Sequence, residues 1–129
     1  MTSAVPWIAV VDDEVSVRTM LRRVLRLADY QVAAFGSGEE FLDSLATQVP
    51  ACVILDIHMP GLSGFDVHSR LRSKRTDVPV VFITASDDPS LDQIVLEAKG
   101  VKLLRKPFSS DELLNAVGTA LRRDSSDAR

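Results

Sequence analysis

The centre of the chain reads Ala51-Cys52-Val53-Ile54-Leu55-Asp56, five apolar residues that end in a carboxylate. An uninterrupted apolar run of this length is typical of a strand in a parallel sheet covered by helices on both faces, because neither set of alternating side chains meets water. Similar short runs occupy residues 7–11, 78–83 and 101–104. Residues 31–35 alternate and are more polar, which predicts a further strand at an edge of the sheet.

Between these runs, apolar residues recur every three or four positions, which is the period of a helix with one buried face. We predict helices over residues 17–28, 41–49, 64–74, 91–98 and 113–121. Ser37 stands three positions before Glu40, and Ser109 three positions before Glu112. This is the spacing of a capping box, in which a hydroxyl and a carboxylate bind free amides at a helix start.

Proline and glycine mark the ends of the fourth predicted helix: Pro89 fits its first turn, and Gly100 stands where it would end. The alternation of strands and helices predicts a parallel sheet with right-handed crossovers and helices on both faces. We therefore predict a three-layer α-β-α fold of the α/β class. It forms a single domain over residues 1–123, followed by a polar tail over residues 124–129.

The composition agrees with one globular domain: 129 residues, 46% of them hydrophobic and 26% charged. The single cysteine, Cys52, cannot form an internal disulfide and suits a reducing compartment. With 15 basic and 18 acidic residues the net charge is −3, which offers no excess positive charge for direct binding to nucleic acid. The sequence has no stretch of the ~20 apolar residues that a membrane span requires, and its first residues do not read as a signal peptide. We expect a cytoplasmic protein that contacts neither nucleic acid nor membrane.

Polar side chains end the predicted strands: the first strand ends in Asp12-Asp13, the third in Asp56, the fourth in Thr84 and the fifth in Lys106-Pro107. Taken alone, Asp12 and Asp13 would fit the cap of the following helix. Ligands of open parallel sheets bind at the carboxyl ends of the strands, however, so we expect all five side chains to converge. Three carboxylates a few Å apart repel one another, by about 4 kcal/mol per pair at 4 Å and an effective dielectric of ~20. Lys106 supplies one compensating charge, and hard oxygen ligands without a His or Cys cluster select Mg²⁺ (or Mn²⁺) for the rest.

Such a site suits phosphoryl transfer. The metal ion, the Lys106 ammonium and the Thr84 hydroxyl could contact the three equatorial oxygens of a phosphoryl group while Asp56 attacks phosphorus in line. A carboxylate is a competent nucleophile for this reaction, and the product is an aspartyl-phosphate.

Four separate motifs together resemble the signature of the response-regulator receiver domains of two-component signal transduction, the CheY-like superfamily. They are Asp12-Asp13, the stretch Asp56-Ile57-His58-Met59-Pro60-Gly61-Leu62-Ser63-Gly64, Thr84-Ala85, and Lys106-Pro107-Phe108. The resemblance covers residues 7–121, with the motifs in the order of the family. It implies a flavodoxin-like sheet with the strand order 2-1-3-4-5.

The resemblance also implies roles for individual residues. Asp56 is the phosphoacceptor, and Asp13, Asp56 and the backbone carbonyl of His58 ligate Mg²⁺ directly. Asp12 acts on the metal largely through water.

Thr84 and Lys106 bind the phosphoryl oxygens, and Ala85 leaves space for the group. The Lys106–Pro107 bond is expected to be cis, which only an X-Pro bond adopts at small cost. Such a domain is no conventional enzyme, because it catalyses only its own phosphorylation and dephosphorylation.

In the family, the phosphoryl donor is a phosphohistidine on a sensor histidine kinase or a histidine phosphotransfer protein. Thr84 then moves toward the phosphoryl group, and an aromatic residue three positions before the lysine rotates inward. That position here is Leu103, and the loop from Gly100 to Lys106 is one residue shorter than usual. We expect a switch at Thr84 and Leu103 that alters the surface around the fourth helix and fifth strand by a different rotamer mechanism. The output is a downstream protein target or an effector domain outside this chain, with homodimer formation on phosphorylation as a further option.

Three other functions fit parts of the pattern. A phosphohydrolase of the haloacid-dehalogenase type carries a second Asp two residues after its nucleophile, where this chain has His58, and a cap domain that this chain lacks. A flavin-binding module needs a hydroxyl- and glycine-rich loop after the first strand, whereas Asp12-Asp13-Glu14 would repel phosphate. The third is an adaptor of the receiver type that does not accept phosphate, which labelling with acetyl phosphate would distinguish.

Overall fold

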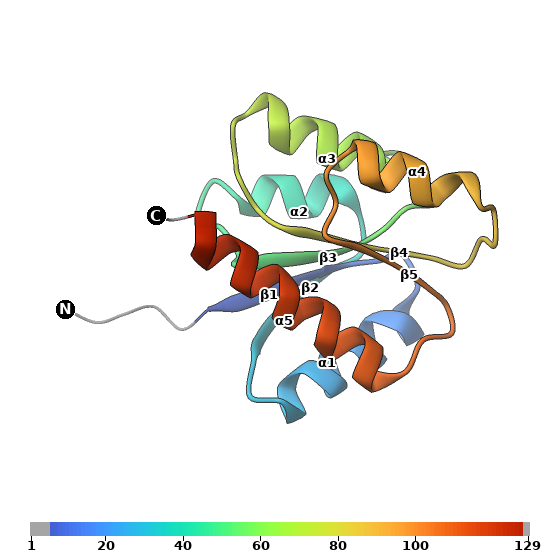
Figure 1. The fold of residues 1–129 in the computed structure, drawn as a ribbon. Helices are drawn as coiled ribbons and strands as arrows, with labels where there is room; N and C mark the ends of the chain where they lie inside the picture. The colour runs from blue at the N-terminus through green and yellow to red at the C-terminus, as the bar shows by residue number, and fades with distance from the viewer. Residues whose placement is uncertain (1–5, 128–129) are drawn as a thin grey trace.

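The computed structural model describes residues 6–127, with side chains described up to residue 122. Five strands form one sheet in the order β2-β1-β3-β4-β5, and every neighbouring pair is parallel. The strands are β1 (Trp7–Val11), β2 (Gln31–Phe35), β3 (Cys52–Asp56), β4 (Val80–Thr84) and β5 (Lys102–Arg105). The predicted sheet and its strand order are confirmed, with β2 at one edge (Figure 1).

The helices are α1 (Val15–Leu27), α2 (Gly38–Ser44), α3 (Gly64–Ser73), α4 (Ser90–Glu97) and α5 (Ser110–Asp127). Figure 1 shows α1 and α5 on one face of the sheet and α2, α3 and α4 on the other. Each face has its own hydrophobic core, and β1, β3 and β4 contribute alternate side chains to both. The strands β3 and β4 are buried along their whole length, as their apolar runs predict.

Some element boundaries differ from the predictions. Asp56 and Thr84 are the last residues of β3 and β4, as predicted, whereas β1 ends at Val11 and β5 at Arg105, one residue before Asp12 and Lys106. The strand β4 begins at Val80, so Pro79 precedes it and its missing N–H removes no hydrogen bond of the strand. The helix predicted over residues 41–49 ends at Ser44, and Val49 is exposed.

The residues at the two ends of α4 also differ from the prediction. Pro89 is the N-cap residue of α4, and the residue in the left-handed conformation at its other end is Lys99, with φ 63°, rather than Gly100. Gly100 is required for a different reason, because a Cβ there would lie 2.8 Å from the ring of Phe82. Asp29 and Arg75 follow α1 and α3 in the same left-handed conformation, so none of these three helix ends uses glycine.

The start of α3, the least periodic helix, has a capping box that the sequence analysis missed. Ser63 Oγ accepts a hydrogen bond from the Asp66 backbone N–H, and the Asp66 carboxylate accepts one from the Ser63 N–H. The spacing is that of Ser109 and Glu112, which form the box predicted for them. The signal in the sequence is Asp66, three positions after Ser63, where an aspartate takes the place of the longer glutamate of the usual motif.

The last helix continues past the predicted domain boundary at residue 123, since α5 ends at Asp127. The first part of the segment predicted as a polar tail, residues 124–127, is therefore helical, and residues 128–129 lie outside the described part of the chain. None of the helices within residues 6–127 combines the length and hydropathy needed to cross a membrane.

Candidate functional site

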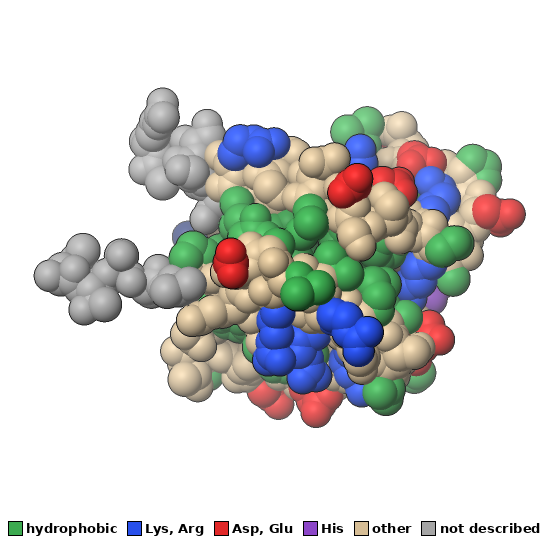
Figure 2. Space-filling view, turned by 90° about the horizontal axis from the view of Figure 1, so that it is seen from below, with side chains coloured by type: hydrophobic (Ala, Val, Ile, Leu, Met, Phe, Trp, Pro, Cys, Tyr) green, Lys and Arg blue, Asp and Glu red, His purple; other side chains and the backbone are tan. Residues whose placement is uncertain are grey.

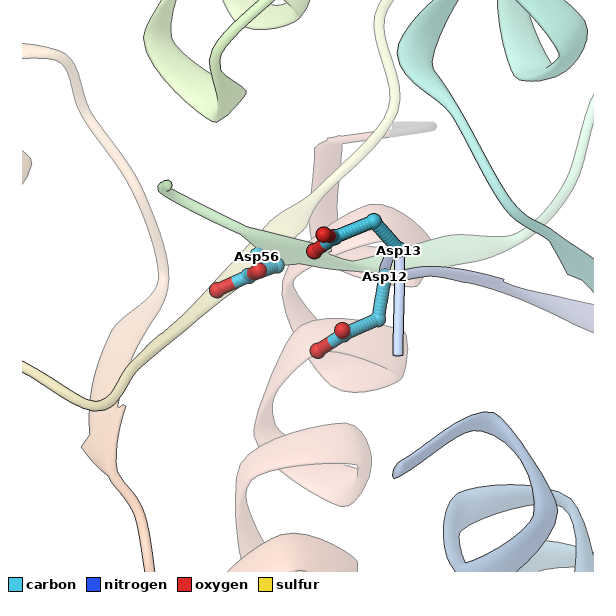
Figure 3. A group of neighbouring side chains, drawn as sticks. All are labelled: Asp12, Asp13 and Asp56. Carbon is cyan, nitrogen blue, oxygen red and sulfur yellow. The ribbon is translucent and has the colours of Figure 1, made fainter. Parts of the chain in front are cut away.

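Three aspartates from two neighbouring strands meet at the carboxyl edge of the sheet (Figure 3). Asp12 and Asp13 directly follow β1, and Asp56 ends β3, which pairs with β1. One carboxylate oxygen of each lies within 4.8 Å of the others. Asp12 is fully buried, Asp56 is 4% exposed and Asp13 is exposed, so the cluster opens to solvent at Asp13. The predicted convergence of these acids is confirmed.

Lys106, the residue that follows β5, extends its side chain into this cluster. Its Nζ lies 2.9 Å from Asp12 Oδ2, 3.7 Å from Asp56 Oδ1 and 3.6 Å from Glu14 Oε1. Burial by itself lowers the pKa of the Lys106 ammonium, but the hydrogen bond to Asp12 and the surrounding carboxylates outweigh it and raise this pKa. Lys106 is therefore a fixed positive charge, bound most closely to Asp12.

The single positive charge of Lys106 does not balance the negative charges of Asp12, Asp13 and Asp56. Burial, together with the charges of Asp12 and Asp13, raises the pKa of Asp56 from 3.8 to about 6, although Lys106 and a hydrogen bond from the His58 backbone lower it. An ionised Asp56 thus lies in surroundings that still repel negative charge. A donor set made only of carboxylate oxygens, with this excess of negative charge, fits a hard divalent cation such as Mg²⁺ or Mn²⁺.

The hydroxyl at the end of β4 is tied to two neighbours. Thr84 is fully buried, and its Oγ1 accepts a hydrogen bond of 3.0 Å from the Ser86 N–H. The same oxygen lies 3.3 Å from Nδ1 of His58, whose side chain is exposed above it. Ala85, the residue after Thr84, is exposed. The imidazole of His58 therefore contacts a predicted site residue.

The backbone around the site is held by short contacts. Gly64 starts α3 against the end of β3, where an added Cβ would lie 2.5 Å from the Asp56 carbonyl oxygen, so only glycine fits there. Gly61 turns the preceding loop with φ 76°. The Lys106–Pro107 peptide bond is cis, as the resemblance implies.

Two arginines whose contacts the sequence did not indicate lie near the site. Arg18 donates a hydrogen bond of 2.7 Å from Nη1 to the backbone carbonyl of Asp12. Arg105, the last residue of β5, forms an ion pair with Asp92 in α4. Nothing in the sequence distinguishes Arg18 from the other arginines of the same helix, since its role depends on the path of the β1–α1 loop.

The predicted switch position, Leu103, lies in β5 and is partly buried. It packs against the core cluster that includes Leu91 and Val95 of α4. Its side chain has no group that can form a hydrogen bond, so any polar coupling between β5 and α4 must come from another residue.

Comparison with known proteins agrees with the fold and the site. Residues 8–118 match the family described as "Response regulator receiver domain". The chain is 38% identical over 115 residues to Nodulation protein W of Bradyrhizobium diazoefficiens, covering 89% of this chain and 51% of that protein. It is 42% identical over 120 residues to Response regulator MprA of Mycobacterium sp. (strain KMS), covering 93% of this chain and 52% of that protein.

Among solved structures, a response regulator receiver protein from Burkholderia phymatum superposes with a TM-score of 0.81 at 41% identity, over 90% of this chain and 94% of that one. The chain spans about half the length of the two curated relatives. Together with the parallel sheet in the order 2-1-3-4-5 and the three clustered aspartates, these matches show that the chain belongs to the response regulator receiver domains of two-component systems, which have the CheY-like α/β fold.

Proposed function

We propose that Asp56 accepts a phosphoryl group from the phosphohistidine of a sensor histidine kinase or a histidine phosphotransfer protein. The observation that carries this proposal is the environment of the Asp56 carboxylate. It ends the central strand β3, is 4% exposed, and has a lysine ammonium 3.7 Å from Oδ1. A nearly buried carboxylate that is repelled by two neighbouring acids is costly to keep without a function that uses it.

The reaction forms one bond and breaks one. A carboxylate oxygen of Asp56 attacks phosphorus, the bond from phosphorus to the donor imidazole nitrogen breaks, and the nitrogen leaves with the bonding electron pair. Lys106 stands where it can balance the charge on the phosphoryl oxygens, and Thr84 can donate its hydroxyl hydrogen to one of them. The exposed Ala85 leaves open space beside Thr84, as a bulkier side chain would not.

Asp12, Asp13 and Asp56, with the backbone carbonyl of His58, would hold Mg²⁺ or Mn²⁺. The three carboxylates supply the hard oxygen ligands that these cations prefer. The cation would supply positive charge that offsets repulsion between the carboxylates and the incoming phosphoryl oxygens. The Lys106 ammonium at 2.9 Å from Asp12 keeps part of the acidic cluster compensated throughout.

Phosphorylation of Asp56 would alter the surface formed by α4 and β5, through Thr84 and Leu103. This surface would contact a downstream protein, an effector domain of a longer chain, or a second copy of the domain. Residues 1–123 would form the receiver unit and act in the cytoplasm, without direct contact to nucleic acid or membrane.

Acetyl phosphate with Mg²⁺, read by intact mass, tests the proposal. We expect the wild-type protein to gain the mass of one phosphoryl group, the Asp56→Asn variant to gain none, and an exposed control, Asp43→Asn, to label like the wild type. Omitting Mg²⁺ should abolish labelling. An unlabelled wild type would refute the proposal and favour the phosphate-independent adaptor, and equal labelling of Asp56→Asn would place the phosphoryl group elsewhere.

A further inference from the structure

An unbroken series of hydrogen bonds connects Thr84 with α4. The Ser86 N–H donates to Thr84 Oγ1 over 3.0 Å, and the Asp88 N–H donates to Ser86 Oγ over 3.1 Å. Asp88 Oδ1 then accepts bonds of 2.9 Å from both the N–H and the hydroxyl of Ser90, the first residue of α4. In this series each residue donates its backbone N–H to the side chain two positions before it. If the Thr84 hydroxyl moves, Ser86 loses a hydrogen bond that holds it in place, and the later bonds of the series depend on the position of Ser86.

Arg105, on the neighbouring strand β5, bonds to both the loop before α4 and α4 itself. Its Nη2 donates a hydrogen bond of 2.7 Å to the backbone carbonyl of Asp88, and its Nη1 lies 3.1 Å from Asp92 Oδ1. The guanidinium therefore holds both the loop before α4 and the first turn of α4. The side chain of Arg105 is 32% exposed, so it is accessible to solvent while making these contacts.

The sheet places Arg105 directly beside Thr84. The two residues are register partners in the β4–β5 pair, and the N–H of Lys106 donates to the Thr84 carbonyl over 2.7 Å. Arg105 lies two residues after Leu103, so both side chains leave the same face of β5, the face that α4 covers. Leu103 contributes only apolar contact to α4, whereas Arg105 contributes charge-assisted hydrogen bonds with fixed geometry.

We propose that Arg105 is the positioning residue that couples the state of Thr84 to the position of α4, in place of an aromatic side chain at residue 103. The proposal rests on the proposed function, because it takes Thr84 to bind a phosphoryl oxygen on Asp56.

The sequence of events follows from the contacts. When the Thr84 hydroxyl turns toward the phosphoryl group, the hydrogen bond from the Ser86 N–H to Thr84 Oγ1 breaks, and this N–H loses its acceptor. The turn formed by residues 84–88 then changes, and the Asp88 carbonyl moves relative to the guanidinium. Arg105 cannot keep both Asp88 and Asp92 in their present geometry, because the two donors lie on one planar group. The first turn of α4 therefore shifts, and Arg105 becomes available to a partner.

Backbone amide NMR spectra with and without beryllofluoride and Mg²⁺, the probe for the phosphorylated state, test the coupling. In the wild type, the probe should shift the amide signals of the loop 85–89 and of α4. In Arg105→Gln, the loop signals should still shift, while the shifts over α4 fall at least about threefold, as expected when one coupled contact is removed. Lys102→Gln, an exposed residue of the same strand with the same loss of charge, should behave like the wild type.

Further variants guard against a purely structural effect. Arg105→Lys keeps the charge but cannot bind both acceptors through one planar group, so it should restore only part of the α4 response. Asp92→Asn should reduce the α4 shifts by itself and cause no further reduction when combined with Arg105→Gln. Should Arg105→Gln fail to fold, the α4 shifts of Asp92→Asn alone test the coupling.

The outcomes separate the two proposals. A wild type that shows no Mg²⁺-dependent shift around Asp56 refutes the proposed function and the coupling with it. The coupling through Arg105 is refuted, and the proposed function left intact, by either of two results in a wild type that binds the probe. In the first, the wild type itself shows no shifts over α4; in the second, the shifts over α4 are as large in Arg105→Gln as in the wild type.

Discussion

Replacing Asp56 with Asn should stabilise the metal-free protein at neutral pH and leave it nearly unchanged in strong acid. Burial and the neighbouring acids raise the pKa of Asp56 in the folded protein from 3.8 to about 6. A folded-state pKa above the unfolded value means that ionisation disfavours the folded state. This penalty is absent below the unfolded pKa, grows as the pH rises between the two values, and is complete above about 6.

The magnitude follows from the size of this shift. Because one pKa unit corresponds to about 1.4 kcal/mol, a change from 3.8 to about 6 gives a penalty of about 3 kcal/mol at pH 7.5. At pH 5 the penalty is about 1.5 kcal/mol by the same relation. Asn mimics the protonated carboxyl group and has no charge, so it should remove the whole penalty. Mg²⁺ at about 100 times its Kd should raise the stability of the wild type by about 2.7 kcal/mol and that of Asp56→Asn by less.

Urea unfolding with a chelator present, followed by circular dichroism at several pH values, measures these differences. Asp66→Asn is a matched control of opposite sign, because hydrogen bonds from Ser63 lower the pKa of Asp66. Its carboxylate stabilises the fold at neutral pH and loses this effect as the pH falls through the folded-state pKa, so the control should be less stable than the wild type at pH 7.5. An Asp56→Asn variant whose stability difference does not change with pH, or which is destabilised at pH 7.5, would show that the charge environment derived for Asp56 is wrong.

Three further changes test the surroundings of the site. Lys106→Met leaves the buried Asp12 and Asp56 without their cation and should destabilise the protein by about 3–5 kcal/mol at pH 7.5, measured by urea unfolding. The loss should be smaller at pH 4, where Asp56, whose pKa is raised to about 6, is protonated, and an equal loss at both pH values would contradict the ionic explanation. Gly64→Ala places a Cβ 2.5 Å from the Asp56 carbonyl oxygen and should cost about 2–4 kcal/mol, read as a lower thermal midpoint; an unchanged midpoint would show that the contact relaxes freely. Lys99→Gly relieves a positive φ of 63° and should stabilise the fold by about 0.5–1 kcal/mol, whereas a lower midpoint would exclude strain at this helix end.

The sequence predicted the strands well because β3 and β4 are buried on both faces, and burial on both faces produces a continuous apolar run. It predicted helix ends less well. The apolar spacing of Leu45 and Val49 continues the pattern of α2, but the chain leaves the helix after Ser44 and Val49 is exposed. A spacing of three or four residues shows where a helix would be amphipathic, and it does not show whether the sheet is long enough to cover the next turn.

The convergence of Asp12, Asp13 and Asp56 followed from the sequence, since parallel strands bring their carboxyl ends to one edge whatever the details of packing. Which groups pair within that edge was decided only by the tertiary structure. Lys106 lies closer to Asp12 than to Asp56, at 2.9 against 3.7 Å. Arg105 bonds to residues 13 and 17 positions earlier in the chain, on a different element. Hydrogen bonds and ion pairs change strongly over a few tenths of an ångström, and such distances depend on how helices and loops settle on the sheet rather than on residue spacing.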